Sequence, residues 1–174
     1  FSEEALKRAR ANGLNVSWCN LDEGIPETDQ SFDVVLAGDI IEHLFDPIFA
    51  LKEINRVLKN DGVLLGTLPN DIGLVTRLMT LFGISYQEHM YMWKGYYKHH
   101  TFFTPRLMRF MIDKAGMKIT KQHNIFLHRP HSFRVRFLPS AFYNEVIFRV
   151  EKTESEMAAP KKFSLYEKIL RSHW

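Results

Sequence analysis

The sequence predicts an α/β protein built around a doubly wound sheet. Two apolar runs of strand length, at 32–38 and 63–68, contain almost no polar residues, which is typical of strands covered on both faces of a parallel sheet. An amphipathic helical pattern lies between them, so that strand, helix and strand alternate. Composition agrees with a globular chain of this class: 45% of the 174 residues are hydrophobic and 25% are charged. These values exclude disordered and collagen-like chains.

The first element is predicted to be a helix. Ser2 can cap it, and the acidic residues Glu3 and Glu4 suit the positive end of the helix dipole. Gly13 ends the helix. Residues 14–19 then indicate a short strand, followed by an acidic loop that reaches Ser31.

The two apolar strands are joined by a second helix. Asp46 and Pro47 supply its cap and its first-turn proline. A broad apolar stripe runs through 49–58, with charged residues on the other side. A turn at 60–62 leads into the second strand, which ends at Pro69-Asn70.

A long connection follows, over residues 71–100. It exceeds the 2–6 residues that are usual between elements of an α/β unit, so we interpret it as an insert. Residues 72–82 favour a helix. The stretch 90–97 is rich in Met and aromatic residues, which could form a lid over an apolar acceptor or pack in the core of an inserted helix.

The remaining predicted elements are a helix, further strands of the sheet, a linker and a short C-terminal helix. Thr104-Pro105 starts a helix with Leu107, Phe110 and Met111 inward, and Gly116 ends it. Strands are predicted at 117–127 and 142–153. Between them, the basic and aromatic segment 128–137 favours an edge strand with solvated arginines. Residues 154–162 indicate a linker, and residues 163–170 a short helix.

The carboxyl ends of the strands nominate a binding site before any family is considered. In doubly wound sheets, ligands bind outside these ends, where the strand order reverses. Here the ends are Asn20-Leu21, Gly38-Asp39 and Pro69-Asn70. We expect them to meet along one rim around a nucleoside-sized hollow.

Cysteine, hydropathy and charge restrict the setting. A single cysteine, Cys19, allows neither a disulfide framework nor a zinc cluster, which favours a reducing, cytoplasmic location. No apolar run approaches the roughly 18 residues of a membrane-spanning helix. Residues 1–70 carry 6 Lys and Arg against 12 Asp and Glu, whereas residues 71–174 carry 17 against 8. A basic half can attract anionic partners such as RNA, although it is more often a solvated surface.

Four short motifs follow one another in order: FDVV at 32–35, EHL with DP at 42–47, EINRVLKNDG at 53–62 and LPN at 68–70. This ordered set resembles the class I S-adenosylmethionine-dependent methyltransferases, and within them the type 11 and type 23 branch with an "FDVV…EHL.DP…RVLK.GG…PN" signature. The resemblance implies a Rossmann-like fold. It also implies that residues 1–153 are the C-terminal part of the domain, with 154–174 as an extension.

The resemblance also implies an incomplete sheet. The family's first strand ends in a glycine-rich turn and its second in an acidic residue, and neither is present here. The first two strands would then be missing, leaving a gap between the strands at 14–19 and 32–38 with unpaired backbone groups. We therefore expect the isolated chain to lack stable folding, cofactor binding and activity.

The resemblance assigns the cofactor, S-adenosyl-L-methionine, to the rim. Adenine would lie against Asn20 and Leu21, where the family usually has Asp in place of Asn. An Asx-turn is the alternative role for Asn20. Ala37, Gly38 and Asp39 would line the methionine end of the pocket, because Gly38 permits close approach of the backbone.

Histidines supply the candidate acid–base groups. His43 and His100 could remove a proton from an oxygen acceptor, because imidazole titrates near neutral pH. His100 belongs to a segment that resembles the family's "H…FT" motif, whose histidine faces the acceptor. A surface position is the alternative, and it is favoured for His99 over His100.

A metal site is the less favoured reading of the same residues. Asp39, Glu42, His43 and either His99 or His100 would offer oxygen and nitrogen ligands suited to Mg²⁺ or Mn²⁺. The set resembles the E-x-x-E-H arrangement of two metal-dependent methyltransferase branches. The alternative is a capped turn with a hydrogen-bonded His43.

The resemblance therefore implies a methyltransferase, or its C-terminal portion, that acts on a small-molecule or lipid-like acceptor, with oxygen as the expected acceptor atom. Two alternatives remain open. A non-catalytic methyltransferase-like scaffold would fit Asn20 and the absent glycine-rich turn, and an RNA-modifying methyltransferase would fit the basic half. The sequence does not predict the oligomeric state.

Overall fold

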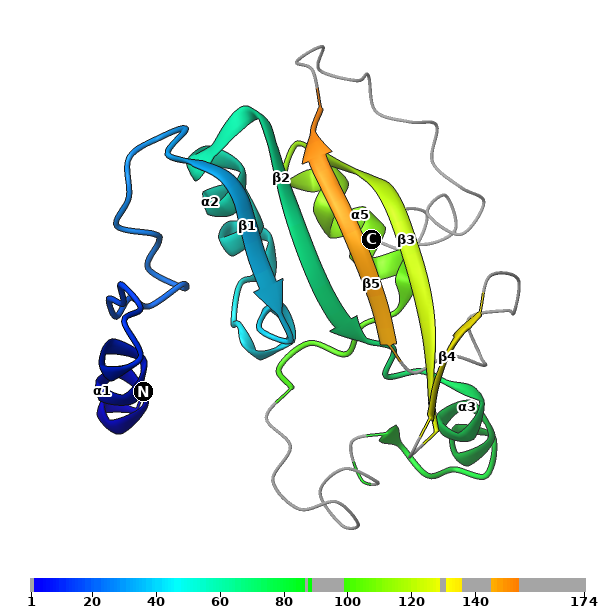
Figure 1. The fold of residues 1–174 in the computed structure, drawn as a ribbon. Helices are drawn as coiled ribbons and strands as arrows, with labels where there is room; N and C mark the ends of the chain where they lie inside the picture. The colour runs from blue at the N-terminus through cyan, green and yellow to red at the C-terminus, as the bar shows by residue number, and fades with distance from the viewer. Residues whose placement is uncertain (1, 87, 89–98, 129–130, 136–144, 154–174) are drawn as a thin grey trace.

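The fold is a five-stranded mixed sheet with helices packed on one face (Figure 1). The computed structural model describes residues 2–86, 88, 99–128, 131–135 and 145–153. The strand order is β1-β2-β5-β3-β4, and β1 pairs with β2 in parallel whereas the other neighbours are antiparallel. The strands are β1 (Phe32–Gly38), β2 (Leu58–Pro69), β3 (Met117–His128), β4 (His131–Val135) and β5 (Glu145–Lys152).

Capping side chains begin three of the helices as the sequence predicts. Ser2, Asp46 and Thr104 each accept a hydrogen bond from the backbone N–H three residues later, which satisfies a donor that the helix leaves unpaired. None of the helices within the described ranges is long and apolar enough to cross a membrane. The helices are α1 (Glu3–Ala11), the 3₁₀-helix η1 (Ile41–His43), α2 (Pro47–Val57), α3 (Leu74–Leu81) and α5 (Pro105–Lys114).

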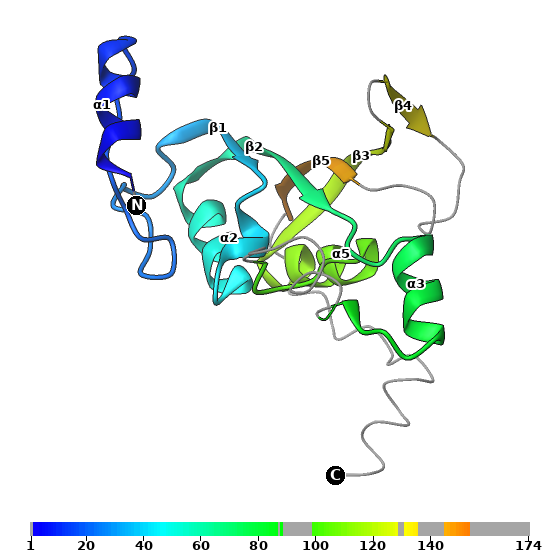
Figure 2. The ribbon, with the colours of Figure 1, turned by 90° about the horizontal axis from the view of Figure 1, so that it is seen from below.

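The hydrophobic core lies between the sheet and the helices α2 and α5, which both cover the same face (Figure 2). Leu51 and Ile54 of α2 are buried, as are Met108 and Ile112 of α5. Residues of β1, β2, β3 and β5 form the other side of this core. Burial of this apolar surface is the main force that holds the helices to the sheet.

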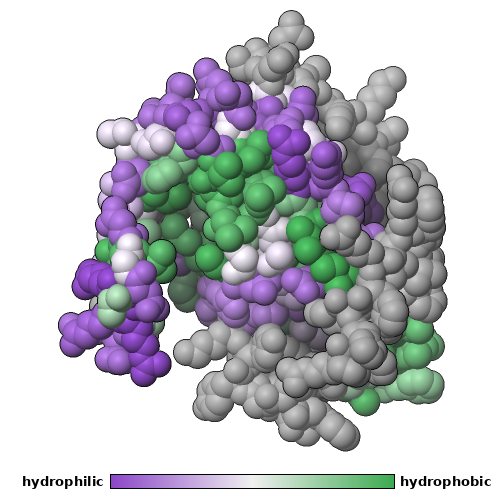
Figure 3. Space-filling view, in the orientation of Figure 1, coloured by the Kyte–Doolittle hydropathy of each residue, from purple (hydrophilic) through white to green (hydrophobic). Residues whose placement is uncertain are grey.

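The opposite face of the sheet is apolar and uncovered by the described residues. Figure 3 shows apolar side chains gathered over it. Val34 is 52% exposed and Leu36 is 74% exposed, because β1 is an edge strand and no described helix lies over this face. The prediction that β1 is covered on both faces is therefore wrong for the described part of the chain. The exposed apolar residues of β1, β2 and β5 on this face are Phe32, Val34, Leu36, Leu65 and Ile147.

The predicted strand at 14–19 does not form. A strand needs a neighbour to satisfy its backbone groups, and no described strand lies beside this segment. Leu14 and Trp18 are consequently exposed, at 61% and 58%. The predicted turn at 60–62 is a bulge within β2, since Phe32 pairs with Leu58 while Val34 already pairs with Val63.

The second half follows the predicted order. Helix α3 lies inside the predicted range 72–82, and α5 begins after Thr104 as predicted. Met108 and Ile112 form its buried face, whereas Phe110 is 48% exposed, which corrects its predicted inward position. β4 is an edge strand, as favoured from the sequence. The stretch 90–97 and the extension 154–174 lie outside the described residues.

Candidate functional site

The ends of β1 and β2 are joined by Asp39 and Thr67. The backbone N–H of Asp39 donates to Oγ1 of Thr67 at 3.1 Å, and that hydroxyl donates to Oδ1 of Asp39 at 2.8 Å. Asp39 adopts a φ of +49°, in the left-handed region that residues other than glycine rarely occupy. Backbone strain of this kind is typical of functional sites. The pair therefore marks the carboxyl end of β1 as a candidate site.

Gly38 stands beside this pair. Among the described residues, a Cβ at Gly38 would meet Oγ1 of Thr67 alone, at an ordinary contact distance of 3.7 Å. Gly66 differs, because a Cβ there would overlap the ring of Phe148. The fold thus explains the glycine at 66 but not the one at 38. Ala37, which precedes Gly38, is 4% exposed and belongs to the core.

Asn20-Leu21, another of the three predicted strand ends (called tips below), forms a turn at the same end of the sheet. Oδ1 of Asn20 accepts from the N–H of Asp22 at 3.2 Å, which is the Asx-turn alternative raised from the sequence. Oδ1 of Asp22 in turn accepts from the N–H groups of Phe45 and Asp46, at 3.0 and 3.2 Å. Leu21 is partly buried in this turn.

All three tips thus lie near the carboxyl ends of the parallel strands, as predicted. Phe45 and Asp46 immediately precede α2, which begins at this end of the sheet, so the turn at Asn20 adjoins it. That the tips enclose a nucleoside-sized hollow stays a prediction.

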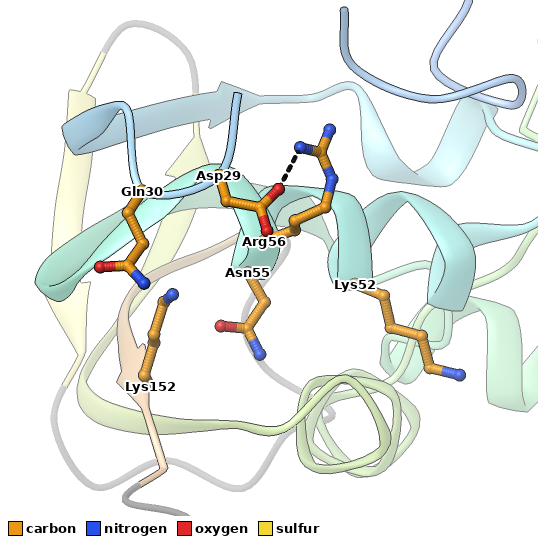
Figure 4. A pocket seen from close by; sticks show the side chains of 6 residues that line it. All are labelled: Asp29, Gln30, Lys52, Asn55, Arg56 and Lys152. Carbon is orange, nitrogen blue, oxygen red and sulfur yellow. Dashed lines mark hydrogen bonds and ion pairs between the residues drawn. The ribbon is translucent and has the colours of Figure 1, made fainter. Parts of the chain in front are cut away.

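A pocket of about 320 Å³ lies at the other end of the strands (Figure 4). Its lining includes Gln30, just before β1, and Lys152, the last residue of β5. Arg56 also lines it, but its guanidinium is committed to Asp29, to Glu53 and to two backbone carbonyls. This pocket is therefore separate from the rim at Gly38-Asp39.

Glu42 is the most unusual side chain near the rim. It is 1% exposed although it carries a carboxyl group. Burial is the largest effect and raises the pKa of Glu42 above its usual value. A backbone hydrogen bond and His43 lower this pKa in part, and the carboxylates of Asp39 and Asp71 add weaker raising effects. Its Oε2 accepts no hydrogen bond from the described residues. A buried acceptor in this state is costly and needs an explanation.

Two histidines flank Glu42. Nε2 of His43 lies 4.0 Å and Nε2 of His99 lies 3.9 Å from Oε1 of Glu42, and the two imidazoles meet edge to face with centroids 4.9 Å apart. The side chain of His43 is 44% exposed, whereas that of His99 is only 6% exposed. One ligand atom from each of the three residues lies within 4.8 Å of the others. We call this set the Glu42–His43–His99 cluster.

His99, rather than His100, therefore lies beside Glu42 and His43. The sequence favoured a surface position for His99 over His100, and the structure reverses that order. The backbone N–H of His100 donates to the carbonyl of Glu42 at 2.9 Å, and its ring lies against Phe45 with centroids 4.3 Å apart. His100 is exposed next to the rim, outside the cluster.

Asp71, which the sequence analysis did not single out, anchors His99. Its carboxylate accepts from the hydroxyl of Tyr86 and the N–H of Phe103, both at 2.8 Å, and lies 3.2 Å from Nδ1 of His99. Asp71 is 5% exposed. The sequence could have identified Asp71 as a site residue, because it follows the end of β2 at Pro69 by two residues. Ligands bind outside such strand ends in sheets of this type.

Comparisons with known proteins find methyltransferases. The family model described as "Methyltransferase domain" matches residues 1–66. The chain is 26% identical over 149 residues to the mitochondrial ubiquinone biosynthesis O-methyltransferase of Bos taurus, which covers 84% of this chain and 39% of that protein. It is 39% identical over 67 residues to the demethylmenaquinone methyltransferase of Staphylococcus carnosus, covering 36% of this chain and 28% of that one.

Solved structures share the fold. An S-adenosylmethionine-dependent methyltransferase of Thermotoga maritima superposes with a TM-score of 0.66 at 22% identity, over 87% of this chain and 70% of that chain. Another from Mesorhizobium loti gives a TM-score of 0.61 at 16% identity, over 87% and 77%. The chain spans less than half the length of the bovine and staphylococcal relatives.

Proposed function

Since the chain belongs to the class I S-adenosylmethionine-dependent methyltransferases, we propose that the protein that carries it transfers a methyl group from S-adenosyl-L-methionine to an oxygen of a small-molecule or lipid-like acceptor. The observation that carries the proposal is the rim at the ends of β1 and β2. There the strained Asp39 is held by Thr67 beside the open Gly38. The name of the bovine relative, a ubiquinone biosynthesis O-methyltransferase, supports oxygen as the acceptor atom.

Five residues would hold the cofactor. Gly38 and Ala37 would lie along its methionine part, because no side chain of the described residues fills the space above Gly38. The side chain of Asp39 would lie next to them. Asn20 and Leu21 would contact the adenine, with the second lone pair of the Asn20 carbonyl oxygen still able to accept beyond its Asx-turn bond. The bound cofactor supplies an electrophilic methyl group on a positively charged sulfur.

The protein's own chemical task is then to position the acceptor and to take its proton. An acceptor hydroxyl loses its proton as its oxygen bonds to the methyl carbon, while the carbon–sulfur bond breaks and its electron pair stays on sulfur. His43 is our candidate for the proton acceptor. It is the exposed member of the Glu42–His43–His99 cluster, and the buried Glu42 lies 4.0 Å from its Nε2. His100 is the second candidate, held against Phe45 at the rim.

Mg²⁺ or Mn²⁺ in the same cluster is a second candidate. The observation that favours it is Oε2 of Glu42, which is buried and accepts no hydrogen bond from the described residues. Glu42, His43 and His99 would hold the ion, because their ligand atoms lie within 4.8 Å of one another. Asp39 and His100, also proposed as ligands, are engaged elsewhere, with Thr67 and Phe45. Such an ion would supply positive charge beside the acceptor oxygen.

The cation is tested separately from the transfer. Protein stripped of metal by a chelator should take up Mn²⁺ with a changed electron paramagnetic resonance spectrum, and a Glu42→Gln variant should not. Undiminished turnover of the stripped protein would contradict a role for the ion.

Methyl transfer is tested on the intact polypeptide with labelled cofactor and fractionated small molecules, lipids and RNA. We expect label in small molecules or lipids. Replacing His43 by Gln should lower kcat by roughly 10²- to 10⁴-fold while leaving cofactor binding unchanged. His123→Gln is the matched control, because His123 lies on β3 and is exposed. Cofactor binding without transfer to any fraction would favour the scaffold alternative, and label in RNA would favour the RNA-modifying one.

A further inference from the structure

Asp71 gathers three hydrogen-bond donors from different parts of the chain. The hydroxyl of Tyr86 and Nδ1 of His99 both lie against its Oδ1, at 2.8 and 3.2 Å, while the backbone N–H of Phe103 donates to its Oδ2 at 2.8 Å. The backbone of Asp71 is itself fixed, since its N–H donates to the carbonyl of Phe103 at 3.1 Å. The carboxylate therefore has a defined orientation.

A carboxylate can only accept hydrogen bonds, so the contact with Asp71 selects one form of the neighbouring imidazole. Nδ1 of His99 must carry the proton that it shares with Asp71. In the neutral ring, the lone pair then lies on Nε2. Nε2 is the atom on the Glu42 side, 3.9 Å from Oε1, which is too far for a hydrogen bond between them.

We propose that Asp71 is a positioning residue that fixes the Nδ1–H tautomer of His99 and so presents the Nε2 lone pair to the Glu42–His43–His99 cluster. The side chain of His99 is 6% exposed and is therefore buried, and its ring contacts the ring of the exposed His43. An Nε2 lone pair gives the cluster an acceptor for a proton or a ligand for a cation, both of which the opposite tautomer would remove. The use of this tautomer rests on the proposed function, whereas its existence does not.

An Asp71→Asn substitution is predicted to reverse the tautomer. The backbone N–H of Phe103 cannot change from donor to acceptor, so the amide oxygen of the substituted side chain would turn toward it. The amide NH₂ would then face His99 and donate to Nδ1, which moves the ring proton to Nε2. The variant keeps the shape of the side chain and changes only its donors and acceptors.

The experiment is long-range proton–nitrogen correlation spectroscopy of the intact polypeptide with ¹⁵N-labelled histidine, with His99 assigned by the loss of its signal in His99→Gln. The wild-type protein should show a protonated Nδ1 and an unprotonated Nε2. Asp71→Asn should show the reverse. Asp113→Asn, an exposed carboxylate on α5, should keep the wild-type pattern. Tyr86→Phe should also keep it, because the Asp71 carboxylate remains.

The wild-type spectrum alone can overturn the proposal, even if Asp71→Asn fails to fold: a proton on Nε2 with Nδ1 unprotonated would do so. An unchanged tautomer in folded Asp71→Asn would also overturn it. Asp71→Asn should lower kcat about 10- to 100-fold with the KM for the cofactor unchanged. If the wild-type protein binds no cofactor but shows the expected tautomer, the proposed function fails and the role of Asp71 stands.

Discussion

Thr67 holds Asp39 at two points, since its hydroxyl donates to the Asp39 carboxylate at 2.8 Å and accepts from the Asp39 backbone N–H at 3.1 Å. One side chain of β2 thus keeps the residue after β1 in a strained backbone conformation. The geometry of the rim depends on this pair.

Replacing Thr67 by Val should therefore weaken cofactor binding. Valine fits a strand but offers neither the donor nor the acceptor, so Asp39 can relax from its left-handed conformation. We expect an approximately tenfold weaker affinity, about 1.4 kcal/mol, by calorimetry on the intact polypeptide. Thr80→Val on the exposed side of α3 is the control. Equal affinities of the wild type and Thr67→Val would show that the pair has no part in binding.

The buried Glu42 carboxyl group should lower the free energy of unfolding at neutral pH. Because burial raises its pKa in the folded state, ionisation costs free energy as the pH rises from 4.5 through that higher value. Glu42→Gln should thus increase the free energy of unfolding at pH 7 by about 1–2 kcal/mol. The difference should vanish near pH 4, as followed by thermal unfolding at both pH values. A variant that is less stable at pH 7 would contradict this.

Glu53 should have the opposite effect in acid. Hydrogen bonds from Arg56 and from the N–H of Ile25 lower the pKa of Glu53 to about 2. The folded pKa lies below the usual 4.5, so this stabilisation is complete above pH 4.5 and is lost as the pH falls toward 2. Glu53→Gln should cost on the order of 2 kcal/mol at pH 7 and much less at pH 2.5.

The control is Glu4→Gln, which breaks an exposed pair with Arg8 on α1 and should cost less than about 0.5 kcal/mol. Denaturant unfolding at the two pH values measures both variants. A pH-independent loss in Glu53→Gln would refute the assignment.

The uncovered sheet face should make the isolated 174-residue chain associate with itself. An apolar edge strand with exposed side chains is a template for further pairing. Leu36→Ser should reduce the sedimenting aggregate and the binding of a hydrophobic dye. Leu81→Ser on α3 should not, although Leu36 and Leu81 are similarly exposed at 74% and 77%. A monodisperse wild-type chain with no dye binding would contradict the prediction.

Local signals were sufficient for most elements. Asp46-Pro47 and Thr104-Pro105 each fix a helix start by a cap within one turn, and the structure has both. The prediction of a strand at 14–19 was wrong because a strand needs a partner strand elsewhere in space. The pattern of those six residues does not indicate whether such a partner is present.

The rim was predictable in outline, and so were Glu42 and His43 of the cluster, but the choice of its second histidine was not. The strand ends at Gly38-Asp39 follow from the α/β pattern, whereas the choice between His99 and His100 depends on how the chain returns after the insert. That return is set by Asp71 and Phe103, which are 32 residues apart in sequence. No periodicity reports a contact of that length.

A substitution at Gly38 is the sharpest test of the proposed cofactor site, because the fold leaves room for a side chain there. Binding of S-adenosylhomocysteine to the intact polypeptide is measured by calorimetry for the wild type and for Gly38→Ala. We predict saturable one-to-one binding by the wild type and a loss of affinity of tenfold or more in Gly38→Ala, with the melting temperature unchanged. Undetectable binding by the wild type, or equal binding by both, would contradict a cofactor site at this rim.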